Sequence, residues 1–146
     1  CICSPSQIHL YQKRISGPIL DRFDLRIEVG NIPKEILLSE ARAEPSFEIQ
    51  TRVIAARKKQ VERFFNSTCH INAEIPPSLM DQFCSLSLDA KQLLSSAIET
   101  QSLSPRACMR VRKVARTIAD LEHNEEITDA HLAEALQFRE QPSFLQ

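Results

Sequence analysis

Glycine is the most informative shortage in this sequence, because Gly17 and Gly30 are the only two among 146 residues. A phosphate-binding P-loop needs residues that tolerate unusual backbone angles, followed by a lysine and a serine or threonine. Neither glycine stands in such a context. We therefore expect the chain to hold no nucleotide by a P-loop and to hydrolyse no ATP on its own.

Other absences narrow the class of protein. No apolar run approaches the roughly 20 residues that a membrane span needs, and no signal-peptide pattern opens the chain. A formal net charge of −1 predicts no general attraction to nucleic acid, so any contact with a polyanion must be local. The chain begins at Cys1 without an initiator methionine. We expect a cytoplasmic protein with no membrane partner, and we expect this chain to be part of a longer one.

The cysteines do not form the pattern of a disulfide framework, since there are five of them at irregular spacing. None belongs to two matching pairs at the spacing of about two to four residues that is typical of zinc sites. The cysteines, with the histidine that adjoins one of them, are Cys1, Cys3, Cys69, His70, Cys84 and Cys108. We interpret them as reduced thiols, buried or idle, and expect no metal site within this chain.

From residue 46 onward the sequence has the 3.6-residue period of amphipathic helices. The expected N-caps are Ser46, Ser87, Ser104 and Thr128. Pro105 suits the first position of a helix, and two prolines at 76–77 open a short helix. The positions predicted to face inward are Ile49, Val53, Ala56, Gln60, Val61, Phe64, Phe65, Leu88, Leu94, Ala97, Ile98, Ala107, Val111, Val114, Ile118, Leu121, Leu132, Ala135, Leu136 and Phe138. Residues 46–140 are therefore predicted to form a bundle of four long helices and one short one.

The beginning of the chain carries a different pattern. Residues 24–29 alternate polar and apolar, with Leu25, Ile27 and Val29 on one side, which predicts a short strand with one buried face. A lone strand cannot satisfy its own backbone hydrogen bonds. Its sheet partners should therefore lie upstream of this chain.

Two groups of charged residues could serve a function, and the first is Asp21 with Arg22, just before the predicted strand. They could form a surface ion pair of little energy. The alternative is an arginine at the edge of a sheet that points out of its own domain. A guanidinium donates two parallel hydrogen bonds to a phosphate and keeps its charge. Supplied to a neighbouring subunit, it stabilises charge that develops on a transferred phosphoryl group.

The second group is a set of five cations in eleven residues: Arg106, Arg110, Arg112, Lys113 and Arg116. Arg106, Arg110 and Lys113 fall on one helix face, with Arg112 and Arg116 beside it. Such a run is usually a solvated face. However, Arg106 occupies the first turn, where the macrodipole disfavours cations and free N–H groups attract anions. The alternative interpretation is a basic face that binds an external anion, carried by Arg106 together with Arg110, Lys113 and Arg116.

The segment RISGPILDRFDL at residues 14–25 resembles the closing motif of AAA+ ATPases of the magnesium-chelatase-like group. Residues 107–121, above all VARTIADL at 114–121, resemble the C-terminal domain of the same group, in particular its ComM-type and YifB-type members. The resemblance implies that Arg22 is an arginine finger acting in trans, with Asp21 at the subunit interface. It implies that Arg106 is the sensor-2 arginine and leaves open whose nucleotide, its own subunit's or a neighbour's, Arg106 senses.

The same resemblance implies a domain organisation and partners. Residues 1–30 would be the last part of the α/β ATPase core, residues 31–45 a linker, and residues 46–146 an α-helical lid. ATP and Mg²⁺ would be cofactors of the complete protein, with none held by this chain alone. The partners would be the upstream AAA+ core, the neighbouring subunits of a homo-oligomeric ring, and DNA. Cys1 and Cys3 resemble the second half of a four-cysteine cluster whose first half would lie upstream.

Several functions remain open at this point. The ComM-type group implies DNA processing such as branch migration, whereas chelatase proper implies insertion of a metal into a porphyrin with partner subunits. A stand-alone helical module could instead bind nucleic acid through the cations at 106–116, with strongly salt-dependent affinity. A helical adaptor could bind another protein through an apolar groove. We favour the ATPase, because the nucleic-acid module leaves Arg22 and the unpaired strand without a role and the adaptor needs an exposed apolar groove.

Overall fold

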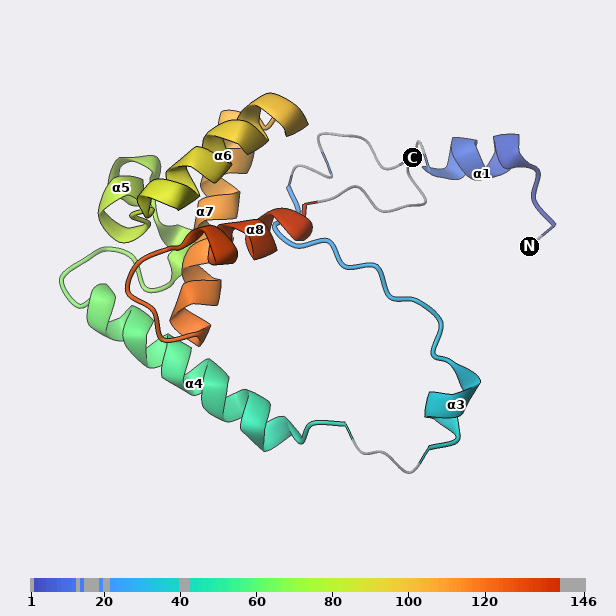
Figure 1. The fold of residues 1–146 in the computed structure, drawn as a ribbon, viewed down its shortest axis with the longest axis horizontal. Coiled ribbons are helices and arrows are strands. Elements are labelled where there is room, and N and C mark those ends of the chain that lie inside the picture. The colour runs from blue at the N-terminus through green and yellow to red at the C-terminus, as the bar shows by residue number, and fades with distance from the viewer. Residues whose placement is uncertain (1, 13, 15–18, 20–21, 40–42, 140–146) are drawn as a thin grey trace.

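A computed structural model describes residues 2–12, 14, 19, 22–39 and 43–139 of the chain. The described residues are mainly helical, as predicted (Figure 1). The α-helices are α1 (Pro5–Gln12), α3 (Lys34–Leu37), α4 (Ser46–Arg63), α5 (Met80–Phe83), α6 (Leu88–Gln101), α7 (Pro105–Leu121) and α8 (Asp129–Gln137). Two 3₁₀ turns, η1 (Asn72–Glu74) and η2 (Pro77–Leu79), lie between α4 and α5. The predicted bundle of four long helices and one short one is therefore confirmed.

The helix α7 is the centre of the bundle, because it packs against α8, α4 and η1, while α8 also packs against α6. Its buried stripe includes Val111, Ala115 and Ile118. The same core contains Phe64 and Phe83, whose rings meet edge to face with centroids 5.0 Å apart. Small and medium apolar side chains fill the rest of the core, as the period of the sequence predicts.

Three of the four predicted N-caps are confirmed. The Ser87 hydroxyl accepts the N–H of Ala90, and the Ser104 hydroxyl accepts the N–H of Ala107. Thr128 forms a capping box with the third residue of α8. The prediction that Ser46 is an N-cap is wrong, because Ser46 is the first helical residue and Pro45 precedes it as the cap. Proline fixes an extended backbone there but offers no side-chain acceptor.

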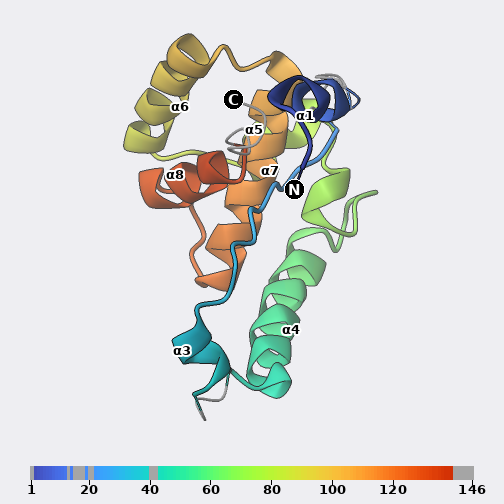
Figure 2. The same cartoon turned by 90° about the vertical axis from the view of Figure 1, so that its right-hand side faces the viewer.

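Several apolar positions predicted to face inward are exposed. The side chains concerned are Ile49, Val53, Val61 and Phe65 on and after α4, Leu88 and Ile98 on α6, and Leu121 on α7. Phe65 is 84% exposed and Leu88 is 72% exposed. The N-terminal half of α4 projects beyond the other bundle helices (Figure 2), so the bundle covers little of that half. Periodicity identifies an apolar face but cannot say how far a neighbouring helix reaches along it.

The predicted strand at residues 24–29 is not observed. Among the described residues, the one β-type contact is an isolated parallel bridge between Leu86 and Ile127. Residues 24–29 are extended without a partner strand, and Leu25, Ile27 and Val29 are 51%, 69% and 87% exposed. The extended segment then leads away from the bundle to α3 (Figure 1). A strand needs a second strand for its hydrogen bonds, and no described residue supplies one.

None of the described helices is both long enough and apolar enough to cross a lipid bilayer. The longest, α4 and α7, each carry charged residues along their length. They belong to the bundle described above.

Candidate functional site

The start of α7 presents Arg106 to solvent. Ser104 caps the helix and Pro105 takes the first position, so Arg106 lies in the first turn. The side chain is exposed, and no hydrogen bond or ion pair joins it to any residue that the structure describes. The helix dipole places partial positive charge at this end, which disfavours a cation unless an anion is near. Arg106 is therefore available to an external anion such as a phosphate.

One turn further along α7, Arg110 reaches the segment that contains Arg22. Its Nη1 donates to Asp24 Oδ1 at 2.7 Å and also to the carbonyl oxygen of Arg22. The Arg110 side chain is 19% exposed and that of Asp24 is 57% exposed. Arg22 itself is exposed, and its backbone N–H donates to the Ile19 carbonyl at 2.9 Å. The structure thus brings the segment of Arg22 beside the first half of α7.

The next two cations of α7 bind inside the chain. Lys113 Nζ donates to the Ala73 carbonyl oxygen at 2.8 Å, which joins α7 to η1. Arg112 Nη2 donates to the carbonyl of Cys84 at 2.9 Å and to Asp81 Oδ1 at 2.8 Å, at the end of α5. These two side chains hold short elements of the bundle against α7. They do not form an open basic face.

Arg116 is not part of an exposed basic face, and that prediction is wrong. Arg116 as a residue is 1% exposed, and its side chain is the largest fully buried one among the described residues. Its guanidinium donates to the carbonyl oxygens of Asn124 and Glu125 and to Asp120 Oδ1. The loop between α7 and α8 wraps around it, so Arg116 fixes the position of α8. A helical wheel could not reveal this, because the loop comes from outside the helix.

Asp120 is the residue that the sequence analysis missed. Its carboxylate is buried and accepts hydrogen bonds from Arg63, from Arg116 and from Asn72 Nδ2, the last at 2.8 Å. Burial by itself raises the pKa of Asp120, but these hydrogen bonds and the neighbouring charges hold that pKa below its ordinary value. Burial likewise lowers the pKa of Arg116. The available signal was an arginine and an aspartate four residues apart within an apolar stripe.

The thiol of Cys84 and the imidazole of His131 are both buried within the bundle. Cys84 is buried, and this burial raises the pKa of its thiol to about 11. His131 is buried in the first turn of α8, where its Nδ1 accepts the Thr128 N–H at 3.0 Å. No group of three or more His, Cys, Asp or Glu side chains among the described residues could hold a metal ion. Cys1 and Asp21 lie outside the described residues.

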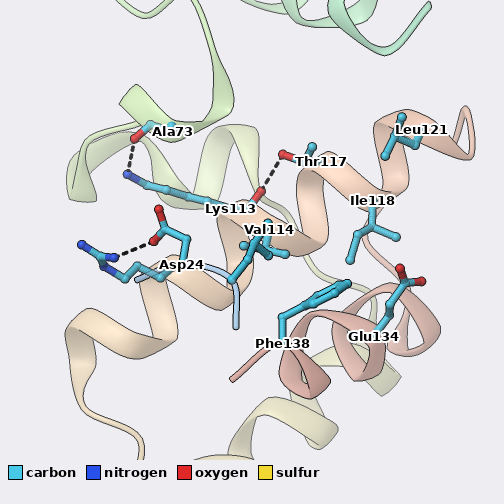
Figure 3. A pocket seen from close by; sticks show the side chains of 11 residues that line it. Asp24, Ala73, Lys113, Val114, Thr117, Ile118, Leu121, Glu134 and Phe138 are labelled. Atoms are coloured by element: carbon cyan, nitrogen blue, oxygen red, sulfur yellow. Dashed lines mark hydrogen bonds and ion pairs between the residues drawn. The ribbon is translucent and has the colours of Figure 1, made fainter. Parts of the chain in front are cut away.

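A cavity of about 380 Å³ lies between α7, α8 and the start of the extended segment. Its apolar lining includes Val114, Ile118 and Leu121 on one side of α7 and Phe138 at the end of α8 (Figure 3). Leu25 also lines it. The Asp24–Arg110 pair and Lys113 stand at its edge, and each of these side chains already has a partner (Figure 3). The cavity therefore has a largely apolar wall beside the segment of Asp24 and Leu25, and Thr117 and Glu134 also line it.

Matches to known proteins extend over nearly the whole chain. Residues 43–139 match the family described as magnesium chelatase, subunit ChlI C-terminal, and residues 1–39 match magnesium chelatase, subunit ChlI. The competence protein ComM of Haemophilus influenzae is 40% identical over 98% of this chain and 28% of its own length. The protein YifB of Escherichia coli is 39% identical over 94% of this chain and 26% of its own length. An uncharacterized protein of Mycobacterium tuberculosis is 31% identical over 96% of this chain and 28% of its own length. The chain thus spans little more than a quarter of these relatives.

Proposed function

Because this chain belongs to the magnesium chelatase subunit ChlI family, we propose that it is the C-terminal part of a ring-forming AAA+ ATPase. In the complete protein, an upstream core binds ATP and Mg²⁺. This chain supplies Arg22 as the arginine finger, and the bundle is the lid that carries Arg106 as sensor 2. Asp21 lies with Arg22 at the contact between neighbouring subunits.

The observation that carries the proposal is the pair of contacts from Arg110 to the Arg22 carbonyl and to Asp24. These contacts hold the Arg22 segment one helical turn from Arg106. Among the five cations of α7, Arg106 alone lacks a partner within the described chain. We therefore expect both arginines to face the same nucleotide. Since a finger acts on the neighbouring subunit, Arg106 acts on that subunit's nucleotide too.

Work on DNA is our preferred function for the complete protein. The supporting observation is 40% identity to a protein named for competence. Metal insertion is the second candidate, because the family description names magnesium chelatase. ATP hydrolysis stimulated by branched DNA supports the first, and stimulation by a porphyrin with its metal supports the second. A nucleic-acid module acting through α7 alone loses support, since four of the five cations bind within the chain.

The central test uses two arginine variants of the complete protein. Arg22→Ala should leave ATP binding nearly intact and lower hydrolysis by about 10³-fold or more, because a finger stabilises mostly the transition state. Arg106→Ala should weaken nucleotide affinity as well as turnover, since a lid arginine contacts phosphate before reaction. Calorimetric binding and steady-state hydrolysis measure both effects.

Mixed rings decide whether Arg22 acts across the interface. Subunits with Arg22→Ala are mixed with subunits that lack the P-loop lysine. In the mixture an Arg22→Ala subunit binds ATP while its neighbour supplies an intact finger, so hydrolysis should recover. If the mixture stays inactive while both variants assemble into rings, Arg22 is not the finger.

A further inference from the structure

Hydrogen bonds made by Arg110 and by Arg26 fasten residues 22–26 to the bundle. Arg110 on α7 binds the Arg22 carbonyl and the Asp24 carboxylate. The Arg26 N–H donates to the Phe138 carbonyl at 2.9 Å, and Arg26 Nη1 donates to the next carbonyl, of Arg139, at 3.2 Å. Between these anchors, Leu25 lines the cavity formed by α7 and α8. The segment is thus held by its backbone and charges, with none of its side chains fully buried.

We propose that Arg110 is a positioning residue that couples the lid to the arginine finger, by holding the backbone of Arg22 to the same helix face that presents Arg106. This inference rests on the finger and sensor-2 roles proposed above. When Arg106 engages a phosphate, α7 moves as a rigid element and carries the Arg22 segment with it. Binding of nucleotide by the lid therefore sets the position of the finger.

The chemistry of the contact suits this role. A guanidinium is planar and presents several N–H donors in a fixed fork, so one arginine can bind a carbonyl and a carboxylate at once. Arg110 lies four residues after Arg106, which places both on one side of α7. The flanking Ala107 and Val111 are buried in the bundle, so α7 cannot shift its N-terminal half independently of the lid. Arg110 directly links that helix to the backbone of Arg22.

Arg112 shows what an arginine of α7 with a purely structural role contacts. Arg112 lies two residues away, and it also binds a carboxylate and backbone carbonyls, but these belong to α5 within the bundle. Arg110 instead binds a segment that contributes no side chain to the core. Replacement of the Arg110 side chain should therefore leave the bundle folded and weaken the coupling between the lid and the arginine finger. Arg112 is the matched control for the same chemistry without the link to Arg22.

The experiment measures hydrolysis and ATP binding by the complete protein with Arg110→Gln, Arg110→Lys, Asp24→Asn and the control Arg112→Gln. Arg110→Gln should lower kcat about tenfold, as expected for loss of a charge-assisted hydrogen bond, with ATP affinity unchanged. Arg110→Lys and Asp24→Asn each keep part of the contact and should give smaller losses. Arg112→Gln should lower the melting temperature and leave kcat per folded ring within about twofold of the parent.

Coupling to Arg22 is tested in an Arg22→Ala background, which leaves no finger side chain for Arg110 to position. There Arg110→Gln should cause no further loss of kcat, because the residue acts only through the finger. Amide exchange of Arg26 should accelerate in Arg110→Gln and stay unchanged in Arg112→Gln, which reports on the clamp without any ATPase assay. If Arg22→Ala lowers hydrolysis but Arg110→Gln does not, the coupling is wrong and the finger assignment stands. If Arg110→Gln lowers kcat equally in both backgrounds, Arg110 acts by another route and the inference fails. If Arg22→Ala has no effect, the proposed function itself fails.

Discussion

The bundle at residues 46–139 and the segment at residues 2–39 use apolar side chains in different ways. Every buried apolar side chain of the described chain lies in the bundle. In the segment, by contrast, Leu25, Ile27 and Val29 alternate with polar residues and remain largely exposed. A helix satisfies its backbone internally and needs only one packed face, whereas a strand needs partners for both its backbone and its face. The bundle therefore buries its own apolar faces, whereas no described residue covers the apolar side of the segment at residues 24–29.

The largest effect on the bundle should come from Asp120→Ala. The change leaves Arg116 buried with no carboxylate partner, and breaking one half of a buried ion pair costs about 3–5 kcal/mol. Urea unfolding followed by circular dichroism measures this loss. Asp81→Ala is the control, because Asp81 pairs with Arg112 but is 97% exposed, and it should cost less than about 1 kcal/mol. Equal losses for the two variants would mean that the buried cluster does not hold the bundle together.

Two isoleucines compare the two regions directly. Ile127 is fully buried and Ile27 is 69% exposed. Ile127→Ala should lower the free energy of unfolding by about 2–5 kcal/mol, because it opens a cavity in the core. Ile27→Ala should change it by less than about 0.5 kcal/mol in the isolated chain. A substantial loss for Ile27→Ala would contradict the separation of the two regions.

Acid should weaken the bundle through Asp120. The pKa of Asp120 is lowered in the folded state from its ordinary value of 3.8. The ionised carboxylate therefore contributes fully to the free energy of unfolding at pH values above 3.8. The contribution is lost as pH falls through the lowered pKa. Urea melts at a series of pH values between about 2 and 6 measure this dependence. The Asp120→Asn variant should be less stable than the parent at neutral pH. Its free energy of unfolding should also fall less steeply below about pH 4. If the free energy of unfolding falls as steeply in the variant as in the parent, other carboxyl groups cause the unfolding in acid.

The smallest effect on the fold is expected from alkylation of the thiols. It compares an exposed cysteine of the segment with a buried cysteine of the bundle. Cys3 is exposed, whereas Cys84 is buried and its pKa is raised to about 11. The thiolate is the reactive form, so at pH 7 an alkylating reagent should modify Cys3 rapidly and Cys84 only when the bundle opens. Mass spectrometry of digested protein over time measures both rates. Rapid modification of Cys84 in the folded state would contradict its burial.

Local sequence signals predicted most of the bundle. Ser87, Ser104 and Thr128 start helices because a side-chain oxygen can accept an N–H within three residues. The inner stripe of α7 follows from spacing alone. The same signals also selected Arg106 as an exposed cation at a helix start, because neighbours in the sequence set that position. Its proposed role, and that of Arg22, came from the resemblance and remain predictions.

The tertiary structure decided what depends on residues far apart in the chain. Arg116 and Arg106 look alike in the helical run, yet the loop at 122–128 buries Arg116, while Arg106 stays exposed among the residues that the structure describes. Arg110 meets Asp24 across 86 positions of sequence, and Arg63 meets Asp120 across 57. Charge and spacing along a helix cannot encode such partners, since a guanidinium binds whatever acceptor the fold brings to it. The sequence thus determined where helices begin and which face is apolar, and packing determined which cations are left to act outside the chain.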